Sequence, residues 1–580
     1  MPLSFMRPFY TAGGFFLRRL QFLPRLYLPL TTLLCLVYAW RPIGGGFDFW
    51  AHAAVGRWIA NHMQVPRQTL FLWSASSEWV AHSWLSELFF YILMQAGESL
   101  RRGWGAYVIV IFTALLITAT FLLLWRLWMR HGRLNIFAPV LFALAIWCSA
   151  PRFQPRQEIF SALFVVLLLA YLLAWSQERL GQWRSHSRAD DIPDSLAFAL
   201  VPLFLLWVNL HALVLVGLAL LTVTVVCDAL QDGFEARVRL LVVVTVLCAI
   251  ATCINPYGLD YWSAADQLRP GNMAQFIEEW QSPLHSDALV PAMWSYVIAE
   301  FILVAAAFGA WRLNPQRRWS QVAWLLVMSI LFLRQRRHLW LLALVALVVL
   351  AANARYLDTE RIWAWWRRAT KQPQMLNIPA GPRAIAQSGV VFCLALWIAT
   401  AALTKWRDLW PLRAVGRDVP EGAVRAIETR NLRGRLFNDY ENSSYLQWRL
   451  NGPLQSGPNR GRVLTHGQRP LYIDLLNAYP DGENGLMVEY LDAVFKPGRA
   501  AQVLQRRRVS YVVLGAHRRK SPLAQYLTSQ GKTVWAHIYK GSDADIWVRR
   551  TAPANSSLQR QNANQSANQK VRTGIGTFHE

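Results

Sequence analysis

Asp48 is a carboxylate at a position where chemistry is expected. It follows the first apolar run and three glycines at 44–46, and it opens a predicted helix over 49–62. His52 comes four residues later, on the same helical face. A carboxylate that stays ionised beside a membrane can orient or deprotonate an acceptor hydroxyl, or hold a divalent cation such as Mg²⁺ or Mn²⁺. The alternative is a helix N-cap, a position that favours aspartate.

Glu158 is a second carboxylate with basic residues close by. Arg152 and Arg156 precede it in a short gap between two apolar runs. Two arginines and one glutamate in such a loop can clamp a phosphate and supply a base or a metal ligand. The alternative is an arginine–glutamate pair that anchors a helix end.

A basic cluster occupies another short gap between apolar runs. Arginine binds phosphate through two parallel hydrogen bonds, so the cluster predicts contact with the phosphate or pyrophosphate of a lipid. Contact with ordinary lipid head groups is the alternative. The members of this cluster are Arg334, Arg336, Arg337 and His338.

Further polar residues lie near the same ends of the apolar runs. A histidine can orient a ligand or act as a base, but it is also a common structural residue at a helix end. We expect these residues to line a substrate site around the two carboxylates. They are His52, Arg57, Glu78, His82, Asn209, His211, Tyr257 and Glu279.

Two acidic pairs elsewhere are interpreted differently. Asp543 and Asp545 match the D-x-D pattern of nucleotide-sugar enzymes, but they fall in a predicted hairpin turn, where aspartate is common. Asp190 and Asp191 fall in a loop predicted to face the cytoplasm. Neither pair is expected to contribute to the site.

The elements that must position these residues are membrane spans. Of the 580 residues, 54% are hydrophobic and 16% are charged, and the mean hydropathy is +0.22. Soluble domains carry about 25% charged residues. The net charge of +25 is explained by arginines that flank spans, and no basic-aromatic binding module is visible, so no nucleic-acid partner is expected. The fold class is a polytopic α-helical membrane protein in contact with membrane lipid.

Apolar runs suited to spanning helices recur along the chain. A weaker run lies at 84–97, and the basic clusters stay on one side of the membrane only if this run does not cross. We therefore expect about eleven spans, a cytoplasmic N-terminus and an extracytoplasmic C-terminus. The eleven stronger runs lie near 24–40, 104–126, 135–150, 159–176, 196–210, 213–228, 239–254, 292–311, 320–333, 339–353 and 386–403.

This orientation places the candidate residues at the outer face. Residues 41–103 become a long first extracytoplasmic loop with juxtamembrane helices, and the short loop containing Glu158 also faces outward. The arginines at 334–337 depart from the positive-inside pattern, and an anionic ligand would explain the departure.

Beyond the transmembrane domain, predicted over 1–403, the chain becomes hydrophilic. We expect a small extracytoplasmic α/β domain over 404–550. Residues 551–580 are rich in Asn, Gln and Ser and predict a disordered tail. Predicted strands lie near 435–438, 470–474, 509–514 and twice within 533–549, with predicted helices near 441–449, 486–494 and 499–507.

With these residues assembled, the chain resembles the GT-C-type integral membrane glycosyltransferases. This superfamily includes protein mannosyltransferase-like and aminoarabinose-transferase-like enzymes, and the chain is similar to its uncharacterised bacterial members. The resemblance rests on Asp48 just after the first span, a long first outward loop, Glu158 in the second outward loop and a soluble final domain. The segments Trp50–Ile59, Trp79–Glu87, Trp207–His211 and Asn255–Gly258 are also similar.

The resemblance implies a function. Members typically transfer a hexosyl or pentosyl group from a polyprenyl-phosphate sugar to a glycan or lipid acceptor at the extracytoplasmic face, here of the bacterial inner (plasma) membrane. Asp48 and Glu158 would be the catalytic residues. Many members have paired acids or a D-x-D in these loops, which this sequence lacks, so the metal is left open.

Two other functions fit the same residues. One is a glycan ligase or polymerase with lipid-pyrophosphate donors, which would use the arginines and histidines and leave Asp48 structural. The other is a non-enzymatic glycan-binding membrane scaffold or a transporter. Transporters place ionisable residues near the bilayer midplane.

Overall fold

A computed structural model describes residues 23–74, 78–132, 134–179, 194–262, 277–284, 291–357, 380–410, 412–452, 469–473 and 485–550. The chain divides into two compact units. The first comprises Met1–Leu70, Ser77–Val419 and Tyr479–Glu483, and the second comprises Phe71–Ser76, Pro420–Ala478 and Asn484–Glu580. Asp190, Asp191 and the predicted tail over 551–580 lie outside the described residues.

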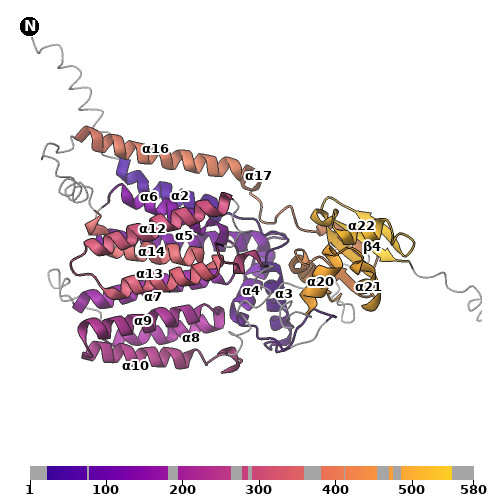
Figure 1. Cartoon of the computed structure of the whole chain (residues 1–580), viewed down its shortest axis with the longest axis horizontal. Coiled ribbons are helices and arrows are strands. Elements are labelled where there is room, and N and C mark those ends of the chain that lie inside the picture. Colours follow the sequence, from indigo (N-terminus) through magenta and orange to yellow (C-terminus); the bar gives the residue numbers. More distant parts are fainter. Residues whose placement is uncertain are drawn as a thin grey trace, which may run out of the picture. The chain divides into compact units, whose positions relative to one another are not determined.

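The first unit is a helix bundle, and each of the eleven stronger apolar runs coincides with one of its helices. Figure 1 shows these helices running alongside one another. They are α2 (Tyr27–Ala39), α5 (Gly105–His131), α6 (Phe137–Ser149), α7 (Glu158–Arg179), α8 (Leu200–Leu210), α9 (Val214–Asp232), α10 (Ala236–Ala251), α12 (Pro291–Leu313), α13 (Trp319–Arg334), α14 (Leu339–Ala352) and α16 (Ala380–Thr404).

Five helices in the described part of the chain are long and apolar enough to cross a membrane. They are α5, α7, α9, α12 and α16. The chain is therefore a polytopic helical membrane protein. The count of about eleven spans and the orientation stay predictions.

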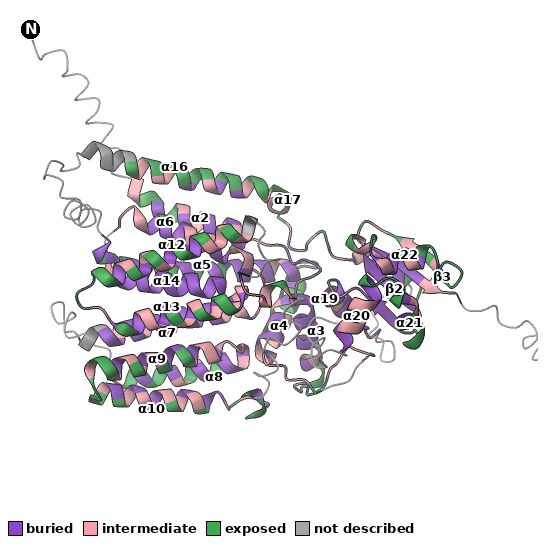
Figure 2. Ribbon diagram, viewed as in Figure 1, coloured by how far each residue is buried: buried purple, intermediate pink, exposed green. Residues whose placement is uncertain are grey.

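Helix α14 forms the core of the bundle. All of its residues are buried, as Figure 2 shows, and it packs against α5, α6, α7, α12 and α13. A helix that is apolar all round is stable only with neighbours on every side. The short 3₁₀ helix η8 (Arg336–His338) directly precedes α14, so its basic residues are held by the most deeply packed element.

Two further helices, α3 (Phe49–His62) and α4 (Trp84–Leu100), lie at one end of the bundle and run across its long helices (Figure 1). They pack closely because Gly56 lets the α3 backbone approach α4. A Cβ atom at Gly56 would lie 2.0 Å from the carbonyl oxygen of Glu87. The apolar run at 84–97 thus belongs to helix α4, which runs across the long helices of the bundle. Its location at the membrane interface stays a prediction.

The glycines at 44–46 allow another close approach, just before α3. Ile43 forms an isolated bridge with Val415, and the Gly45 amide donates to Asp418 Oδ2 at 3.0 Å. A Cβ at Gly44 would lie 2.8 Å from that same carboxylate oxygen. The entry into α3, and with it Asp48, is fixed by this contact.

Shorter elements complete the first unit. They are η2 (Leu23–Leu26), η3 (Ala150–Arg152), η4 (Asp194–Ala199), η6 (Glu278–Trp280), η9 (Ala354–Tyr356) and α17 (Trp406–Leu409).

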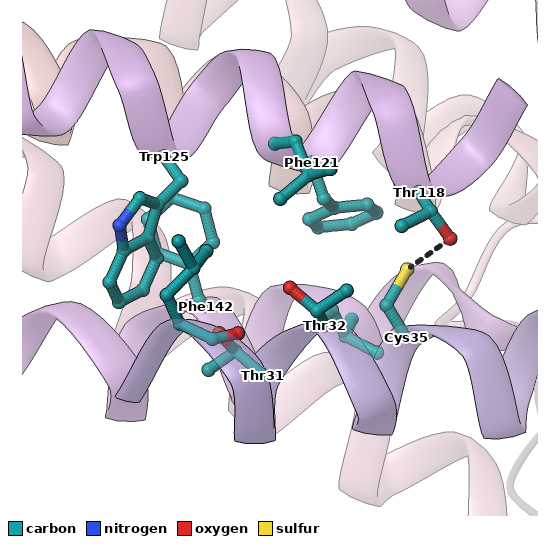
Figure 3. A pocket seen from close by; sticks show the side chains of 10 residues that line it. Thr31, Thr32, Cys35, Thr118, Phe121, Trp125 and Phe142 are labelled. Atoms are coloured by element: carbon teal, nitrogen blue, oxygen red, sulfur yellow. Dashed lines mark hydrogen bonds between the residues drawn. The ribbon is translucent and has the colours of Figure 1, made fainter. Parts of the chain in front are cut away.

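An apolar pocket lies between α2, α5 and α6 (Figure 3). Its walls include Phe121, Trp125 and Phe142, and Thr118 donates a hydrogen bond to the Cys35 sulfur at 3.9 Å. None of the predicted site residues lines it.

The second unit contains a four-stranded sheet in the order β1-β2-β4-β3. Strand β1 (Leu436–Asn438) pairs in parallel with β2 (Tyr511–Gly515), and β4 (Ala544–Arg549) pairs antiparallel with both β2 and β3 (Trp535–Lys540). The helices are α18 (Glu421–Thr429), α19 (Ser443–Leu450), α20 (Leu486–Phe495), α21 (Arg499–Arg506) and α22 (Pro522–Thr528), with η11 (Ala516–Arg518).

One strand predicted for this unit is absent from the described residues. At 469–473, Leu471 forms only an isolated bridge with Leu72, a residue of the first predicted loop. The three consecutive buried residues at 471–473 are explained by this single pairing and by the stacking of Tyr472 on Phe437, with ring centroids 4.6 Å apart.

Replacing Gly56 with alanine should destabilise the first unit. The new methyl group would collide with the α4 backbone, and overpacking of this kind costs about 1–3 kcal/mol. We expect a lower midpoint of thermal unfolding for the purified protein in detergent.

The matched control is Gly309→Ala, in helix α12. A Cβ at Gly309 meets no atom within 4 Å, so its midpoint should be unchanged or slightly higher. Equal midpoints for the wild type and Gly56→Ala would contradict the close contact between α3 and α4.

Candidate functional site

Two arginines and three carboxylates form one cluster in the first unit. Arg152 Nε donates to Glu158 Oε2 at 3.1 Å, and Arg152 Nη1 donates to Glu279 Oε2 at 2.5 Å. Arg152 also donates to the other Glu158 oxygen through Nη2. Arg156 Nη1 donates to Glu279 Oε2 at 3.0 Å, and its Nη2 lies 3.0 Å from Asp48 Oδ2. The order of contacts is therefore Asp48, Arg156, Glu279, Arg152, Glu158.

Three separate segments supply this cluster. Asp48 directly precedes α3, Glu279 lies on η6, and Arg152, Arg156 and Glu158 lie between η3 and the first turn of α7. The side chains of Arg152 and Arg156 are 9% and 13% exposed, whereas those of Asp48 and Glu279 are 26% and 31% exposed. The two arginine side chains are thus the more buried part of the cluster, whereas the carboxylates of Asp48 and Glu279 remain accessible to solvent.

The alternative role for Asp48 as a helix cap is correct for its position only. Asp48 occupies the N-cap position of α3, but its side chain makes no capping hydrogen bond. It pairs with Arg156 instead. The alternative for Glu158 is partly correct, because its pairing with Arg152 does anchor the start of α7.

The basic cluster at 334–338 is connected to the same site through η6. The Arg336 amide donates to the Gln281 carbonyl at 2.9 Å, and Arg336 Nη2 donates to Gln281 Oε1 at 2.7 Å. The Arg337 guanidinium stacks over Trp280, 5.4 Å from the ring centroid. These contacts fasten the segment of Glu279 to the start of α14. Arg334 is exposed at the end of α13.

The charges of the cluster influence one another. Burial opposes ionisation of Glu279, but Arg152 and Arg156 outweigh it and hold the pKa of this carboxyl below its usual value. Burial lowers the pKa of Arg337, as do Arg152 and Arg156, while Glu158 and Glu279 raise it. The charge of Arg337 therefore interacts with four of the five charges in the cluster, those of Arg152, Arg156, Glu158 and Glu279.

Two of the predicted histidines, His82 and His211, are uncharged groups near Arg337. Burial, with His52 and Arg337 nearby, lowers the pKa of His82 to about 4. Burial also lowers the pKa of His211 well below its usual value, and its ring centroid lies 6.4 Å from that of His82. His52 Nδ1 lies 2.8 Å from Glu87 Oε1, an ion pair if the imidazole is protonated. Neutral imidazoles can donate to and accept from hydroxyl groups of a ligand.

Two predicted site residues hold backbone segments together. Asn209 Oδ1 accepts from the Trp84 indole at 2.9 Å. The Tyr257 hydroxyl donates to the Pro66 carbonyl at 2.5 Å and accepts from the Ala81 amide at 2.9 Å. Both side chains therefore position the loop between α3 and α4.

Two further predicted residues, Glu78 and Arg57, do not belong to the charged cluster. Glu78 is exposed, and its backbone forms an isolated bridge with Gln68. Arg57 is buried on α3, where burial lowers its pKa to about 10.

Some neighbours of the site were not predicted. Arg41 Nη1 donates to the Pro151 carbonyl at 2.9 Å, next to Arg152. Ser161 Oγ accepts from the Trp207 indole at 2.8 Å and lies 2.9 Å from His211 Nδ1. Their positions in the sequence could have identified them: Arg41 directly follows the first apolar run, and Ser161 lies about one helical turn after Glu158.

The donor groups of the cluster do not fit a divalent cation. Each of its three carboxylates is paired with a guanidinium, so positive charge already lies where a cation would bind. No group of three His, Cys, Asp or Glu side chains within the described residues could hold a metal ion. We assign no step to a metal.

Comparison with known proteins concerns the fold. No protein-family model and no curated protein matches the sequence. The archaeal oligosaccharyltransferase AglB from Archaeoglobus fulgidus, in complex with an inhibitory peptide and a dolichol-phosphate, has a TM-score of 0.54 and 12% identity, over 92% of this chain and 75% of that chain. ArnT from Cupriavidus metallidurans has a TM-score of 0.47 and 13% identity, over 94% of this chain and 100% of that chain.

The chain therefore shares its fold with an archaeal oligosaccharyltransferase, and its membership of the superfamily noted in the sequence stays a prediction. The bacterial origin and the particular member of the superfamily stay predictions.

His338 should make stability depend on pH. Burial, together with Arg337 and Arg152, lowers its pKa to about 3 from an ordinary value of 6.5. Between these values the unfolded chain binds a proton that the folded chain does not, so stability falls as the pH is lowered through this window. His338→Gln should weaken the decrease in unfolding midpoint between pH 7 and pH 4.

His62→Gln is the control, because His62 is exposed on α3. It should retain the pH dependence of the wild type. An undiminished pH dependence in His338→Gln would show that His338 titrates normally in the folded chain.

Proposed function

We propose that the chain transfers a sugar from a polyprenyl-phosphate donor to an acceptor hydroxyl at the extracytoplasmic membrane face. The observation that carries this proposal is the single cluster in which Arg152 and Arg156 bring Asp48, Glu158 and Glu279 together. The shared fold with an archaeal oligosaccharyltransferase bound to a dolichol-phosphate supports it.

The arginines suit the phosphate of such a donor. Arg152 and Arg156 are held rigid by their carboxylate partners, and Arg337 adds a third positive charge from η8. As the glycosidic bond breaks, the phosphate departs with the bonding electron pair. Fixed guanidinium groups stabilise the negative charge that develops on it.

Asp48 suits the acceptor. Its side chain is accessible, and Arg156 holds one of its oxygens at 3.0 Å. In an inverting transfer, the acceptor oxygen attacks the anomeric carbon from the face opposite the phosphate, and its proton passes to Asp48. Glu158 keeps Arg152 in place. The neutral His82 and His211 are suited to hydrogen bonds with sugar hydroxyls.

The location of the reaction follows the arrangement of charges in the sequence. The candidate residues belong to the predicted outward loops, and the basic clusters of the opposite loops favour the cytoplasmic side. We infer the bacterial inner membrane, with the predicted domain at 404–550 on the extracytoplasmic side.

Replacing Asp48 with asparagine should abolish sugar transfer while leaving the protein folded. The amide keeps the shape of the side chain but can no longer accept the hydroxyl proton. The protein would be reconstituted in vesicles with a panel of polyprenyl-phosphate hexoses and pentoses and a membrane extract as acceptor. Release of polyprenyl phosphate would be measured by mass spectrometry.

Glu235→Gln is the control, because Glu235 is exposed just before α10. It should release polyprenyl phosphate at the wild-type rate. Unchanged release by Asp48→Asn would refute the role of Asp48.

Arg337→Ala distinguishes the proposed transferase from a ligase or polymerase with lipid-pyrophosphate donors. In the proposed reaction both Asp48→Asn and Arg337→Ala lose activity. An active Asp48→Asn variant beside an inactive Arg337→Ala variant would favour the ligase.

A further inference from the structure

Glu279 occupies the position that best suits an anionic ligand. Arg152 Nη1 and Arg156 Nη1 both donate to its Oε2 atom, at 2.5 Å and 3.0 Å. Two guanidinium groups that converge on one oxygen form the arrangement with which arginines bind phosphate. In this protein the carboxylate of Glu279 occupies the position between the two guanidinium groups that a phosphate would take.

Glu279 is also the carboxylate that the arginines need least. Arg152 keeps a two-point pairing with Glu158, and Arg156 keeps Asp48 at 3.0 Å. Without Glu279, both guanidinium groups retain a negative partner. The cluster with Arg337 would then carry three positive and two negative groups, which leaves one positive charge for an anion.

The surroundings of Glu279 allow it to leave. At 31%, its side chain is the most exposed of the five in the cluster. It lies on the three-residue helix η6, whose attachment to η8 runs through Gln281 and Trp280, not through Glu279. The side chain can rotate toward solvent while this attachment remains.

A proton cannot release Glu279 under ordinary conditions. Burial favours its neutral form, but Arg152 and Arg156 keep its pKa below the usual value for glutamate. The carboxylate therefore stays charged at neutral pH and keeps its attraction to the arginines.

We propose that Glu279 is an internal competitor that fills the phosphate position of the donor site, and that the phosphoryl group of an incoming lipid displaces it. The inference rests on the proposed function for the identity of the donor. The displacement itself requires only a phosphoryl group on a lipid or free in solution.

Glu279→Gln should bind a lipid phosphate more tightly than the wild type. The amide keeps the size of the side chain but loses the charge that competes. We expect the dissociation constant of farnesyl phosphate, measured on the full chain in detergent, to fall about tenfold or more, because occupancy by Glu279 no longer reduces the competent fraction. Inorganic phosphate and uncharged farnesol identify the contributions of the phosphoryl group and the chain.

Glu278→Gln is a matched control on the same 3₁₀ turn. Glu278 is 90% exposed, and its nearest cation is Arg336 at 3.9 Å. This variant removes the same charge one residue away, so its dissociation constant should stay within about twofold of the wild type, since exposed charges interact weakly.

Several outcomes would overturn the proposal. Equal or weaker binding of farnesyl phosphate by Glu279→Gln would do so, as would equal gains in both variants. Glu279→Ala is the second variant. Loss of folded protein in both Glu279 variants would make Glu279 a structural counter-ion that the arginines cannot lose.

The outcome is separable from the proposed function. Tighter phosphate binding by Glu279→Gln together with no sugar transfer by the wild type would retain the competitor and reject the transferase. If the wild type transfers sugar but Glu279→Gln binds phosphate as the wild type does, the transferase is retained and the role of Glu279 as a competitor is rejected.

Discussion

The geometry of the site depends on the need of two buried guanidinium groups for negative partners. Removing one partner from a buried ion pair costs about 3–5 kcal/mol, because the remaining charge is left uncompensated. Arg152 and Arg156 are both largely buried, and both must therefore be paired. Their partners come from three segments, at Asp48, Glu158 and Glu279, each more than a hundred residues from the next along the chain. Charge pairing thus fixes loops that the packing of the helices alone would leave undetermined.

The bundle supplies a rigid frame for these pairs. Helix α14 is buried on all sides, and η8 at its start holds η6 through Arg336 and Gln281. On the other side, Gly56 allows α3 to pack directly on the α4 backbone, which places the residue before α3 beside the loop of the arginines. Most of the charged groups of the cluster lie in loops and short turns, whereas packed helices hold these segments in place. This division is common where a rigid scaffold presents functional loops.

Helix positions were the most predictable part of the structure, because long apolar runs have few alternatives in a membrane. Asp48, Arg152, Arg156 and Glu158 could also be singled out as candidates from the sequence, since ionisable residues at the ends of spans are costly without a purpose. The pairing was not predictable. Glu279 lies more than a hundred residues from Arg152, and no local pattern indicates that its carboxylate, not that of Glu278, meets the arginines. The single bridge at Leu471 was mistaken for a strand because a short run of buried apolar residues is expected in both cases.

A site for a lipid phosphate at a membrane surface faces a problem of selectivity. Membranes present many anionic head groups, and three unoccupied arginines would bind them without discrimination. Because the Glu279 carboxylate already occupies the arginines, an anion must bind them more strongly than Glu279 does in order to enter the site. Weak, transient contacts with head groups would then fail to displace Glu279, whereas a donor whose sugar also contacts His82 and His211 would succeed. Every anionic ligand must meet the free-energy cost of displacing Glu279, and only a lipid phosphate that also carries the sugar makes enough contacts to do so. The site would discriminate between ligands in this way.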